Sequence, residues 1–549
     1  MKEITTNEWD LYQRGVDYKN RIGLYQTAQD NNKFYQGDQW QGVESEGLPT
    51  PVFNIIKPVI RHKVSSIMQN DVKIVYSCGN ATAPNYAELE QFADILTKYA
   101  AVMWERLKMD FLNENVLKDA AIQGDGVCHF YWDDEDNNIK AELIDNTNIY
   151  VSNQNYANIE EQEYIIISYR QNVSAVRKEA ERYKVKDVDL IHADQDINEQ
   201  AGEWIELQDE GMCIVLLKYW KEKGRVHFRK STKSVVIVED EDTLLKRYPI
   251  AFFNWETVKN SFHGVSDVTG LIPNQKYVNT IAALIQFSTM HTAFPKMVYN
   301  SSLIDNPDNA VGVAIGVNGA ENVKNMIDYI IPPAISTDAF KMFDTTIKLT
   351  QELMGAGEVA LGNINPEKAS GRAILAIIEQ SAIPLESIRR RFFNYIEDIA
   401  LIWADMWQVH SQDGLQVAFA GDDNSLQTAV IPQEVFDELM LETRIDVGPS
   451  TRWTERALIE TLDNLLMNKF IPFDWYVELI PEGAGLPKAK LKELIEQAQQ
   501  EQMQQEQAQE QPQMDIDALL DSLPPEVQQQ ALQDPQILQD IIAQQLGAQ

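Results

Sequence analysis

Cysteine is scarce in this sequence: three residues in 549, at Cys78, Cys128 and Cys213. They are too few and too scattered for a disulfide framework or a paired-cysteine metal site, so we expect free thiols in a reducing compartment. No apolar run reaches the ~18 residues that a membrane span needs, and the N-terminus has no apolar signal core. We therefore expect a protein that is neither exported nor embedded in a membrane.

Sequence signatures of catalysis are also missing. The histidines lie far apart, without HExxH or His/Cys spacing for zinc, and no GxSxG nucleophile motif occurs. The acidic cluster at residues 133–136 could attract a cation, but a turn between two strands explains it better. We expect no catalytic residue, no cofactor and no bound metal.

One stretch, residues 357–375 (GEVALGNINPEKASGRAIL), has some features of a phosphate-binding loop. A P-loop requires GxxxxGK[ST], with a glycine directly before the lysine. Here Lys368 follows a glutamate and precedes an alanine, and a predicted helix rather than a strand leads into the segment. The stretch is therefore interpreted as a loop whose glycines and asparagines allow its backbone to change shape.

Basic residues are few relative to acidic ones: 47 Lys and Arg against 83 Asp and Glu, for a formal net charge of −36. A protein that grips duplex DNA normally has a basic footprint, which is missing here. The simplest explanation is an acidic protein that self-repulsion keeps from aggregating. The alternative is an acidic wall past which an anion can move without binding.

The composition that is present, 44% hydrophobic and 9% aromatic, suits globular folding. The length predicts about three or four domains. Residues 5–70 are predicted to be mainly helical, and residues 88–124 to form a further amphipathic helix. The first region has one predicted helical face with Tyr18, Ile22, Tyr25 and Ala28.

Residues 127–249 consist of short apolar and β-branched runs that are typical of strands. Hairpin turns are predicted at residues 133–138 and at Lys223-Gly224. A helical insert is expected near residues 173–185.

Two long helices then bracket a small module. We expect a helix over 264–294 that is interrupted early, Gly/Asn-rich short strands over 296–335, and a helix over 336–354 with an N-cap at Ser336. Two helices around a compact module would hold it on a stalk.

A helix of about 35 residues is predicted from residue 371, with Pro384 as the candidate site of a kink. Strand-like runs follow at LQVAFAG and ETRIDVG, then helices over 452–496. The glutamine-rich segment 497–513 is either a solvated helix or a disordered spacer.

Several passages, taken in this order, carry a resemblance to a known family: FYQGDQW, LPTPVFNIIKPVIRHKVSSIM, GDGVCHFYWDDED, YPIAFFNWETVKNSFHGVSDVTGLIPNQKYVN and LGNINPEKASGRAI. Over about residues 30–410 the chain resembles the portal proteins of tailed double-stranded DNA bacteriophages.

The resemblance implies an α+β portal fold with an α/β wing, a two-helix stem, a small α/β clip, a long helix crossing the wing and a helical crown. The implied assignments are wing 1–262, first stem helix 264–293, clip 294–335, second stem helix 336–354, tunnel loop 355–371, long wing helix and returning strands 372–450, crown 451–496 and glutamine-rich tail 497–549.

The resemblance also implies a non-enzymatic virion component that is assembled in the host cytoplasm. It would form a homo-oligomeric ring, usually of twelve subunits, at one capsid vertex, as the head-to-tail connector. Double-stranded DNA would pass through the ring without sequence specificity during packaging and ejection. The implied protein partners are terminase (the packaging ATPase), a head-completion adaptor, and the major capsid and scaffold proteins.

Candidate channel residues follow from the position of the tunnel loop. They are Gly357, Glu358, Gly362, Asn363, Lys368 and Arg372. Lys368 and Arg372 could make shallow, sliding contacts with DNA, and Glu358 would form a competing negative ring; a solvated surface charge is the alternative for each.

Three consecutive arginines, Arg389, Arg390 and Arg391, are expected to form ion pairs between subunits, with contact to the DNA channel as the alternative. Two other functions are alternatives for this sequence. A different virion connector component is disfavoured because such adaptors are typically much shorter and lack paired stem helices. A soluble acidic enzyme would need a site that no motif in the sequence indicates.

Overall fold

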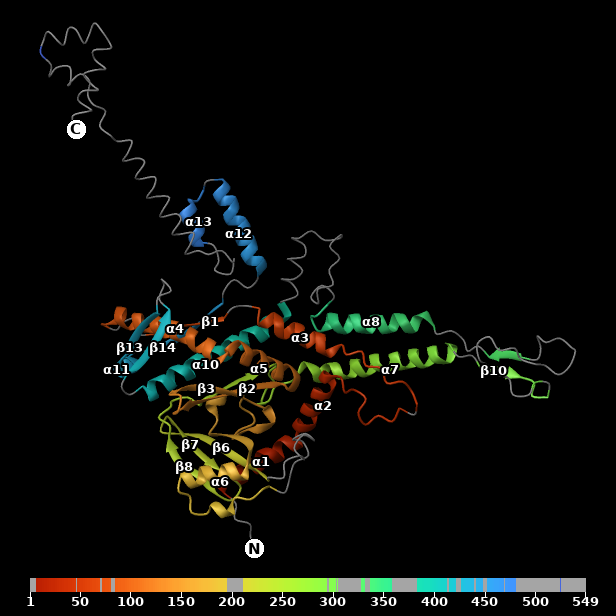
Figure 1. Ribbon diagram of the computed structural model, residues 1–549, viewed down its shortest axis with the longest axis horizontal. Helices are drawn as coiled ribbons and strands as arrows, with labels where there is room; N and C mark the ends of the chain where they lie inside the picture. The colour runs from red at the N-terminus through yellow and green to blue at the C-terminus, as the bar shows by residue number, and fades with distance from the viewer. Residues whose placement is uncertain are drawn as a thin grey trace. The chain divides into compact units, whose positions relative to one another are not determined.

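The computed structural model describes residues 6–45, 47–69, 72–79, 84–194, 211–293, 296–302, 304, 327–330, 336–357, 383–411, 414–420, 426–438, 441–447, 452–468, 470–479 and 524. The chain divides into two compact units, Met1–Ser450 and Thr451–Gln549. The first unit combines helices with antiparallel sheets, so the predicted α+β class is confirmed (Figure 1).

The described helices of the first unit are α1 (Asn7–Arg21), α2 (Leu24–Gln36), α3 (Ile56–Ile67), α4 (Tyr86–Leu107), α5 (Met109–Gln123), α6 (Val173–Arg182), α7 (Asp267–Ala293), α8 (Thr337–Leu353), α10 (Glu386–His410) and α11 (Gln433–Glu438). Its described strands are β1 (Val72–Cys78), β2 (Asp125–Asp133), β3 (Asn138–Ile144), β4 (Ile149–Val151), β5 (Tyr164–Asn172), β6 (Met212–Glu222), β7 (Arg225–Ser231), β8 (Val236–Asp242), β9 (Ile250–Asn254), β10 (Lys296–Tyr299), β11 (Ile327–Ile330), β12 (Leu415–Ala420), β13 (Leu426–Ile431) and β14 (Leu441–Val447).

The two larger sheets have the strand orders β4-β5-β6-β7-β8 and β3-β2-β9, and the smaller ones pair β1 with β14, β10 with β11 and β12 with β13. Both predicted hairpins are confirmed. Asp133 pairs with Asn138 across one turn, and Glu222 pairs with Arg225 across the other. At that second turn Lys223 and Gly224 have φ values of 52° and 80°, as a two-residue turn with a type I′ twist requires.

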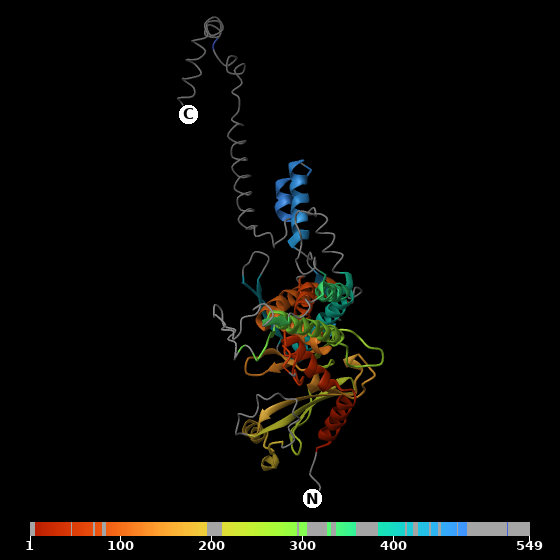
Figure 2. The same ribbon diagram turned by 90° about the vertical axis from the view of Figure 1, so that its right-hand side faces the viewer.

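The five-stranded sheet is covered by helices on both faces (Figure 2). On one face, Val176 of α6 packs with Val215 of β6. On the other face, Val16 of α1 packs with Leu216, the next residue along the same strand. Successive strand residues point to opposite faces, so the unbroken apolar run of β6 is explained by this double cover.

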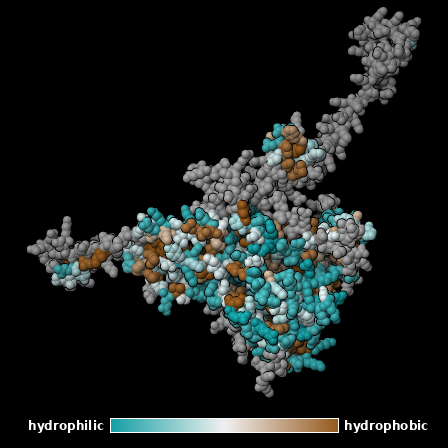
Figure 3. All heavy atoms as spheres, turned by 180° about the vertical axis from the view of Figure 1, so that it is seen from behind, coloured by the Kyte–Doolittle hydropathy of each residue, from teal (hydrophilic) through white to brown (hydrophobic). Residues whose placement is uncertain are grey.

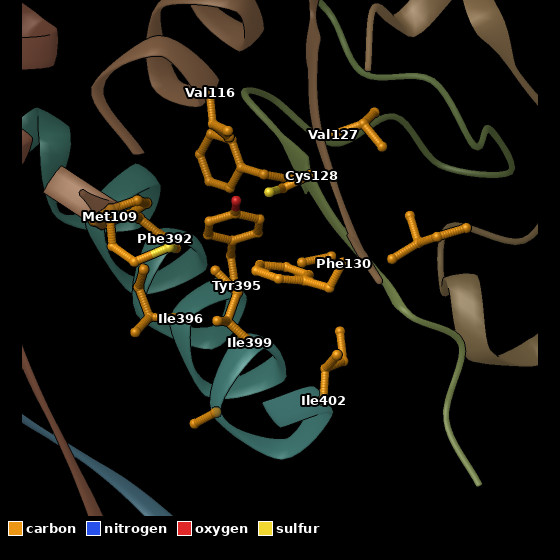
Figure 4. Close-up of a cluster of buried hydrophobic side chains, with 14 of the residues drawn as sticks. Met109, Val116, Val127, Cys128, Phe130, Phe392, Tyr395, Ile396, Ile399 and Ile402 are labelled. Atoms are coloured by element: carbon orange, nitrogen blue, oxygen red, sulfur yellow. The ribbon is translucent and has the colours of Figure 1, made fainter. Parts of the chain in front are cut away.

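The main core of the first unit forms where α10 crosses β2, β9 and α5 (Figure 4). Phe392 and Tyr395 of α10 are almost completely buried, and Phe392 meets Phe253 of β9 edge-on at 6.2 Å between ring centroids. Val116 and Cys128 approach Tyr395 from α5 and β2 in the close-up. Burying each large apolar side chain stabilises the fold by about 1.5–3 kcal/mol, so α10 holds the sheets and the N-terminal helices together.

Two predicted helical regions are broken by residues with a left-handed backbone. The stretch 88–124 is not one helix, because Lys108, at φ 53°, ends α4 and starts α5. Gly23, at φ 69°, separates α1 from α2. The predicted face of the first region is consequently split: Tyr25 is buried, whereas Ile22 is 45% exposed.

The predicted early interruption of the helix over 264–294 is wrong, because α7 runs without a break through Pro273. Pro273 lies on the exposed side of α7, where water can satisfy the carbonyl that the missing N–H leaves free. Pro384 does lie outside regular α-helix, in the 3₁₀ turn Ile383–Leu385 that precedes α10. The predicted start of this helix, at residue 371, is outside the described residues.

The second unit contains α12 (Arg452–Met467) and α13 (Phe473–Leu479), which confirms helices in the first part of the predicted 452–496 region. They are joined by a hydrogen bond from the Tyr476 hydroxyl to the Asp463 carboxylate at 2.5 Å. Residues 480–496 and the glutamine-rich segment lie outside the described residues.

A buried lysine fastens α1 to the five-stranded sheet. The Lys19 side-chain nitrogen donates hydrogen bonds to the carbonyls of Asn146 at 2.7 Å and Ile149 at 2.6 Å, and lies 4.2 Å from the ring centroid of Tyr150. Burial lowers the pKa of Lys19 to about 7, and the carboxylates of Asp145 and Asp125 partly oppose that effect.

The Lys19→Met variant should abolish a pH dependence of stability. Between pH 7 and 10.5 the unfolded chain binds a proton at this lysine that the folded chain does not. The stability of the wild type therefore rises with pH in that window, by up to about 1.4 kcal/mol per unit relative to the variant. Urea unfolding of both proteins at pH 7.5, 8.5 and 9.5 measures the slope. Lys178→Met, at an exposed lysine, is the control. If the difference in unfolding free energy between the wild type and Lys19→Met did not change with pH, the lowered pKa of Lys19 would be contradicted.

Candidate functional site

The first half of α7 is anchored to the N-terminal segment by buried amide side chains. Gln275 is completely buried, accepts a hydrogen bond from the Ile55 N–H at 2.8 Å and donates one to the Phe53 carbonyl at 2.8 Å. Asn279 donates to the Gln39 side-chain oxygen at 2.6 Å. Buried amides need correctly placed partners, so these bonds fix the direction in which α7 leaves the core.

A further set of polar contacts holds the first turn of α7. The Lys63 ammonium lies 2.7 Å from the Asp267 carboxylate, with both side chains largely buried. Asn31 of α2 donates to the hydroxyls of Ser266 at 3.3 Å and Thr269 at 2.9 Å. The base of α7 is therefore tied to α2 and α3 through several independent contacts.

α8 lies beside α7, as the predicted stalk requires (Figure 1). The Asn274 amide donates to the Thr350 hydroxyl at 3.1 Å, and Phe343 meets Phe53 edge-on at 5.3 Å between centroids. The predicted N-cap of α8 is also confirmed, since the Ser336 hydroxyl accepts from the Asp338 N–H at 3.2 Å.

Between the two helices, β10 and β11 form an antiparallel pair that runs from Lys296↔Ile330 to Tyr299↔Ile327. The predicted strand KMVYN is therefore confirmed. The other predicted strand of this module, AVGVAIGV, lies outside the described residues. We call α7, α8 and this strand pair the α7–α8 hairpin.

Large apolar side chains are exposed along the α7–α8 hairpin (Figure 3). Leu284 of α7 is 56% exposed, and Leu349 and Leu353 of α8 are 52% and 81% exposed. With Met342, the two α8 leucines follow an i, i+7, i+11 spacing, which places them on one helical stripe. Exposed apolar side chains repeated along one helical face are typical of a surface that another protein covers.

The same hairpin is nearly neutral in a strongly acidic chain. α7 carries one Asp and one Lys, and α8 carries three acidic and two basic residues, against −36 for the whole chain. Several hydroxyls bond back to their own helix, including Thr289 to the Ile285 carbonyl at 2.8 Å and Thr346 to the Met342 carbonyl at 2.8 Å. Hydroxyls engaged in this way have little left to offer a passing ligand.

The end of α8 leads into the predicted tunnel loop. Gly355 has φ 69° and donates from its N–H to the Glu352 carbonyl at 3.0 Å, which ends the helix. A Cβ at Gly355 would lie 3.6 Å from the Pro384 ring. The residues that come before and after the segment 358–382 in the chain, Gly355 and Pro384, therefore lie close together.

Of the predicted loop residues, Gly357 is described and is half-buried. Glu358, Gly362, Asn363, Lys368 and Arg372 lie outside the described residues, so their placement remains a prediction.

The three predicted arginines lie near the start of α10 and differ in their surroundings. Arg389 bonds the Ser66 carbonyl at 3.2 Å and Glu386 at 3.4 Å. Arg391 donates to the Trp255 carbonyl, and burial lowers its pKa. Arg390 is exposed and makes no hydrogen bond or ion pair with the residues that the structure describes. Of the three, Arg390 is the one whose side chain is not engaged within the described part of the chain, and contact of these arginines with DNA or a neighbouring subunit stays a prediction.

The described residues contain no group of three or more His, Cys, Asp or Glu placed to hold a metal ion, and the acidic cluster is a turn in which Lys140 pairs with Asp133 and Asp136. All three cysteines are free and buried. Within the described part of the chain, no helix combines the length and apolar character that a bilayer span requires.

The exposed apolar side chains of α7 and α8 are typical of a protein that functions in a larger assembly. Comparison with known families agrees: a family model described as Phage P22-like portal protein matches residues 10–549. The chain therefore belongs to the P22-like portal protein family of phages. Among curated proteins, none matches this chain significantly. Portal proteins are structural components of the phage virion that form oligomeric rings through which DNA passes.

Inspection of the sequence alone missed two features of this site. The stripe of Met342, Leu349 and Leu353 was detectable from its helical spacing. The buried amides Gln275 and Asn279 have no sequence signal of their own, since polar residues at i and i+4 on a helix usually face solvent.

Replacing Gly355 by alanine should destabilise the fold, whereas the same change at Gly357 should not. The left-handed backbone at Gly355 costs an alanine about 1–2 kcal/mol. Gly357 has no positive φ, and its new Cβ would make an ordinary contact at 3.8 Å with Glu352. Urea unfolding should show a loss of about that size for Gly355→Ala and less than about 0.5 kcal/mol for Gly357→Ala. Equal losses would indicate that the backbone strain is not at Gly355.

Proposed function

We propose that this protein assembles into a closed ring of twelve subunits at one vertex of the capsid, and that double-stranded DNA moves through the axial channel during packaging and ejection. The observation that carries the proposal is the α7–α8 hairpin, which is firmly anchored at its base and leaves Leu284 and the apolar stripe of α8 exposed.

In this arrangement the α7–α8 helices are the stem, and residues 294–335 are the clip. Residues 1–262 with 372–450 are the wing, 451–496 the crown, and 497–549 a tail. Leu284 and the α8 stripe would be buried against neighbouring stems, because burying several large apolar side chains per subunit favours closure of a ring.

The charge distribution supports weak contact with DNA. A ring of such chains is strongly negative overall, so DNA would gain little from counterion release at its wall. The nearly neutral stem, with many hydroxyls bonded to their own helix, adds no strong phosphate ligand. DNA would pass without sequence-specific binding, because tight phosphate contacts would slow its movement.

The tunnel loop is proposed to be the movable contact with DNA. Lys368 and Arg372 would make shallow contacts with phosphates, and Glu358 would oppose them. Gly355, at the start of the loop, packs close to Pro384, and this contact would confine motion to the residues between these two positions.

The clip is proposed to dock the terminase while the head fills and the head-completion adaptor afterwards. The wing would meet the major capsid and scaffold proteins, and assembly would take place in the host cytoplasm. In this role the protein is a platform and conduit, and the energy for DNA movement would come from the terminase.

A charge placed on the apolar stripes should prevent ring closure without unfolding the subunit. We expect the Leu284→Asp/Leu349→Asp double variant to sediment as a monomer or small oligomer under conditions in which the wild type forms closed rings. Both side chains are more than half exposed in the single chain, so the substitutions remove little core packing.

Gln286→Asp, on the other side of α7, is the matched control and should still form rings. Analytical ultracentrifugation and negative-stain images give the readout. Closed rings formed by the double variant would show that the stripes are not the contact between subunits.

The role of the loop is tested by restricting its backbone. Gly357→Pro and Gly362→Pro should each leave ring assembly intact and lower the yield of DNA-filled heads, because proline fixes φ where the loop must change shape. Gly357→Ala is the control. Quantifying packaged DNA after complementation of a portal-deficient infection provides the measurement, and normal filling by both proline variants would contradict a role for loop movement.

A further inference from the structure

A cavity of about 920 Å³ lies away from the α7–α8 hairpin, where the β2–β3 hairpin, the end of β8 and the C-terminal end of α10 meet. Its volume is near the top of the ~300–1,000 Å³ range of ligand-binding pockets. None of the roles proposed above uses this cavity.

Aromatic side chains form much of its wall. Phe130, Trp132, Tyr219 and Phe228 line it from β2, β6 and β7. Trp132 stacks on the imidazole of His410, with centroids 4.4 Å apart and planes at 4°. The faces of such rings attract cations and also pack against aliphatic chains.

The rim of the cavity is acidic. Asp134, Glu241 and Asp242 line it, and the described lining residues include no Lys or Arg. Asp242 is paired with Arg225 at 3.2 Å. Glu241 pairs with Phe228 through the backbone of the β7–β8 ladder, but the side-chain carboxylates of Asp134 and Glu241 make no hydrogen bond or ion pair with any residue that the structure describes.

His410 does not offset these charges at neutral pH. Burial lowers the pKa of its imidazole, while Asp134 opposes that effect. The unpaired carboxylates therefore present a local excess of negative charge above an aromatic wall.

The rim loop is held in a fixed shape before any ligand binds. The Thr243 hydroxyl donates to the Val226 carbonyl at 2.6 Å, and the Leu244 N–H donates to Asp242 at 2.9 Å. Two residues after Leu244, the N–H of Lys246 donates to the Asp405 carboxylate at 2.7 Å. A preformed site loses less entropy on binding than one that must be ordered by its ligand.

Within this loop, Leu244 has an unusual conformation. Its φ is 61°, in the left-handed region that leucine rarely adopts, and its side chain is 42% exposed at the rim. Strained backbone that the surroundings enforce tends to occur at binding sites. Here it presents an apolar side chain beside the two unpaired carboxylates.

We propose that this cavity binds a segment of another virion or assembly protein that carries a lysine or arginine next to an apolar residue. The cationic group would lie between Asp134 and Glu241, its aliphatic stem against Trp132, and the neighbouring apolar side chain against Leu244. The charge of the rim excludes nucleic acid, and the volume exceeds what one side chain fills.

The test uses two end-capped pentapeptides in calorimetric titration of the assembled full-length protein at low salt. One has lysine at its centre with leucine on either side, and the other has uncharged norleucine in place of lysine. The lysine peptide should bind at least tenfold more tightly than the norleucine peptide.

The Asp134→Asn/Glu241→Gln double variant should bind the lysine peptide at least tenfold more weakly. The control, Glu105→Gln/Glu114→Gln, removes the same charge at exposed positions of α4 and α5 and should bind like the wild type. Equal affinity of both double variants, or of both peptides, would overturn the proposal.

Two further titrations distinguish the proposed protein segment from other occupants of the cavity. If spermidine binds with dependence on Asp134 and Glu241 while the lysine peptide does not bind, the ligand is a small polyamine and the proposed protein segment is wrong. If the peptide binds the dissociated subunit but not the ring, a neighbouring subunit fills the cavity, and the proposal is likewise overturned.

Discussion

The structure depends on how α7 is joined to the core. Gln275 and Asn279 place amide groups in an interior where any unmatched polar atom is costly, and both find partners in residues 39–55. The Lys63–Asp267 ion pair adds a fixed contact at the first turn. Apolar contacts alone would allow α7 to slide or tilt, whereas hydrogen bonds with set directions permit one orientation. The hairpin can therefore hold exposed surfaces at a defined position for neighbouring subunits.

Negative charge and buried apolar side chains are concentrated in different parts of the chain. Most of the excess negative charge lies outside the α7 and α8 helices, which are close to neutral and rich in hydroxyls that bond to their own backbone. The heavily buried aromatic core around α10 stabilises the body without contributing to these surfaces. A conduit for a polyanion needs negative charge for solubility and for repulsion of the polyanion. When that charge lies outside α7 and α8, it does not disturb the contacts between subunits that build the wall of the conduit.

Features with local causes could be predicted from sequence. The Lys223-Gly224 turn and the Ser336 cap follow from the chemistry of a few adjacent residues. The break at Lys108 could not be predicted, because lysine does not favour a left-handed backbone; the break accompanies the packing of α4 against β1 and of α5 against β2, which are tertiary contacts. The pairing of β1 with β14, from opposite ends of the first unit, has no local signal either. The burial of Gln275 and Asn279 and the exposure of Ile22 also depend on tertiary contacts. The resemblance to the portal family came from the order of several passages, none of them decisive alone, and the family match over residues 10–549 confirmed it.

The central claim, that the α7–α8 hairpin surrounds the DNA path, is tested most directly by cryo-electron microscopy of the purified assembly viewed along its axis. The account predicts a closed ring in which α7 and α8 of every subunit line the central channel, with Leu284 and Leu349 at the contacts between subunits. A map in which these helices lie on the outer surface, or in which no central channel exists, would contradict it.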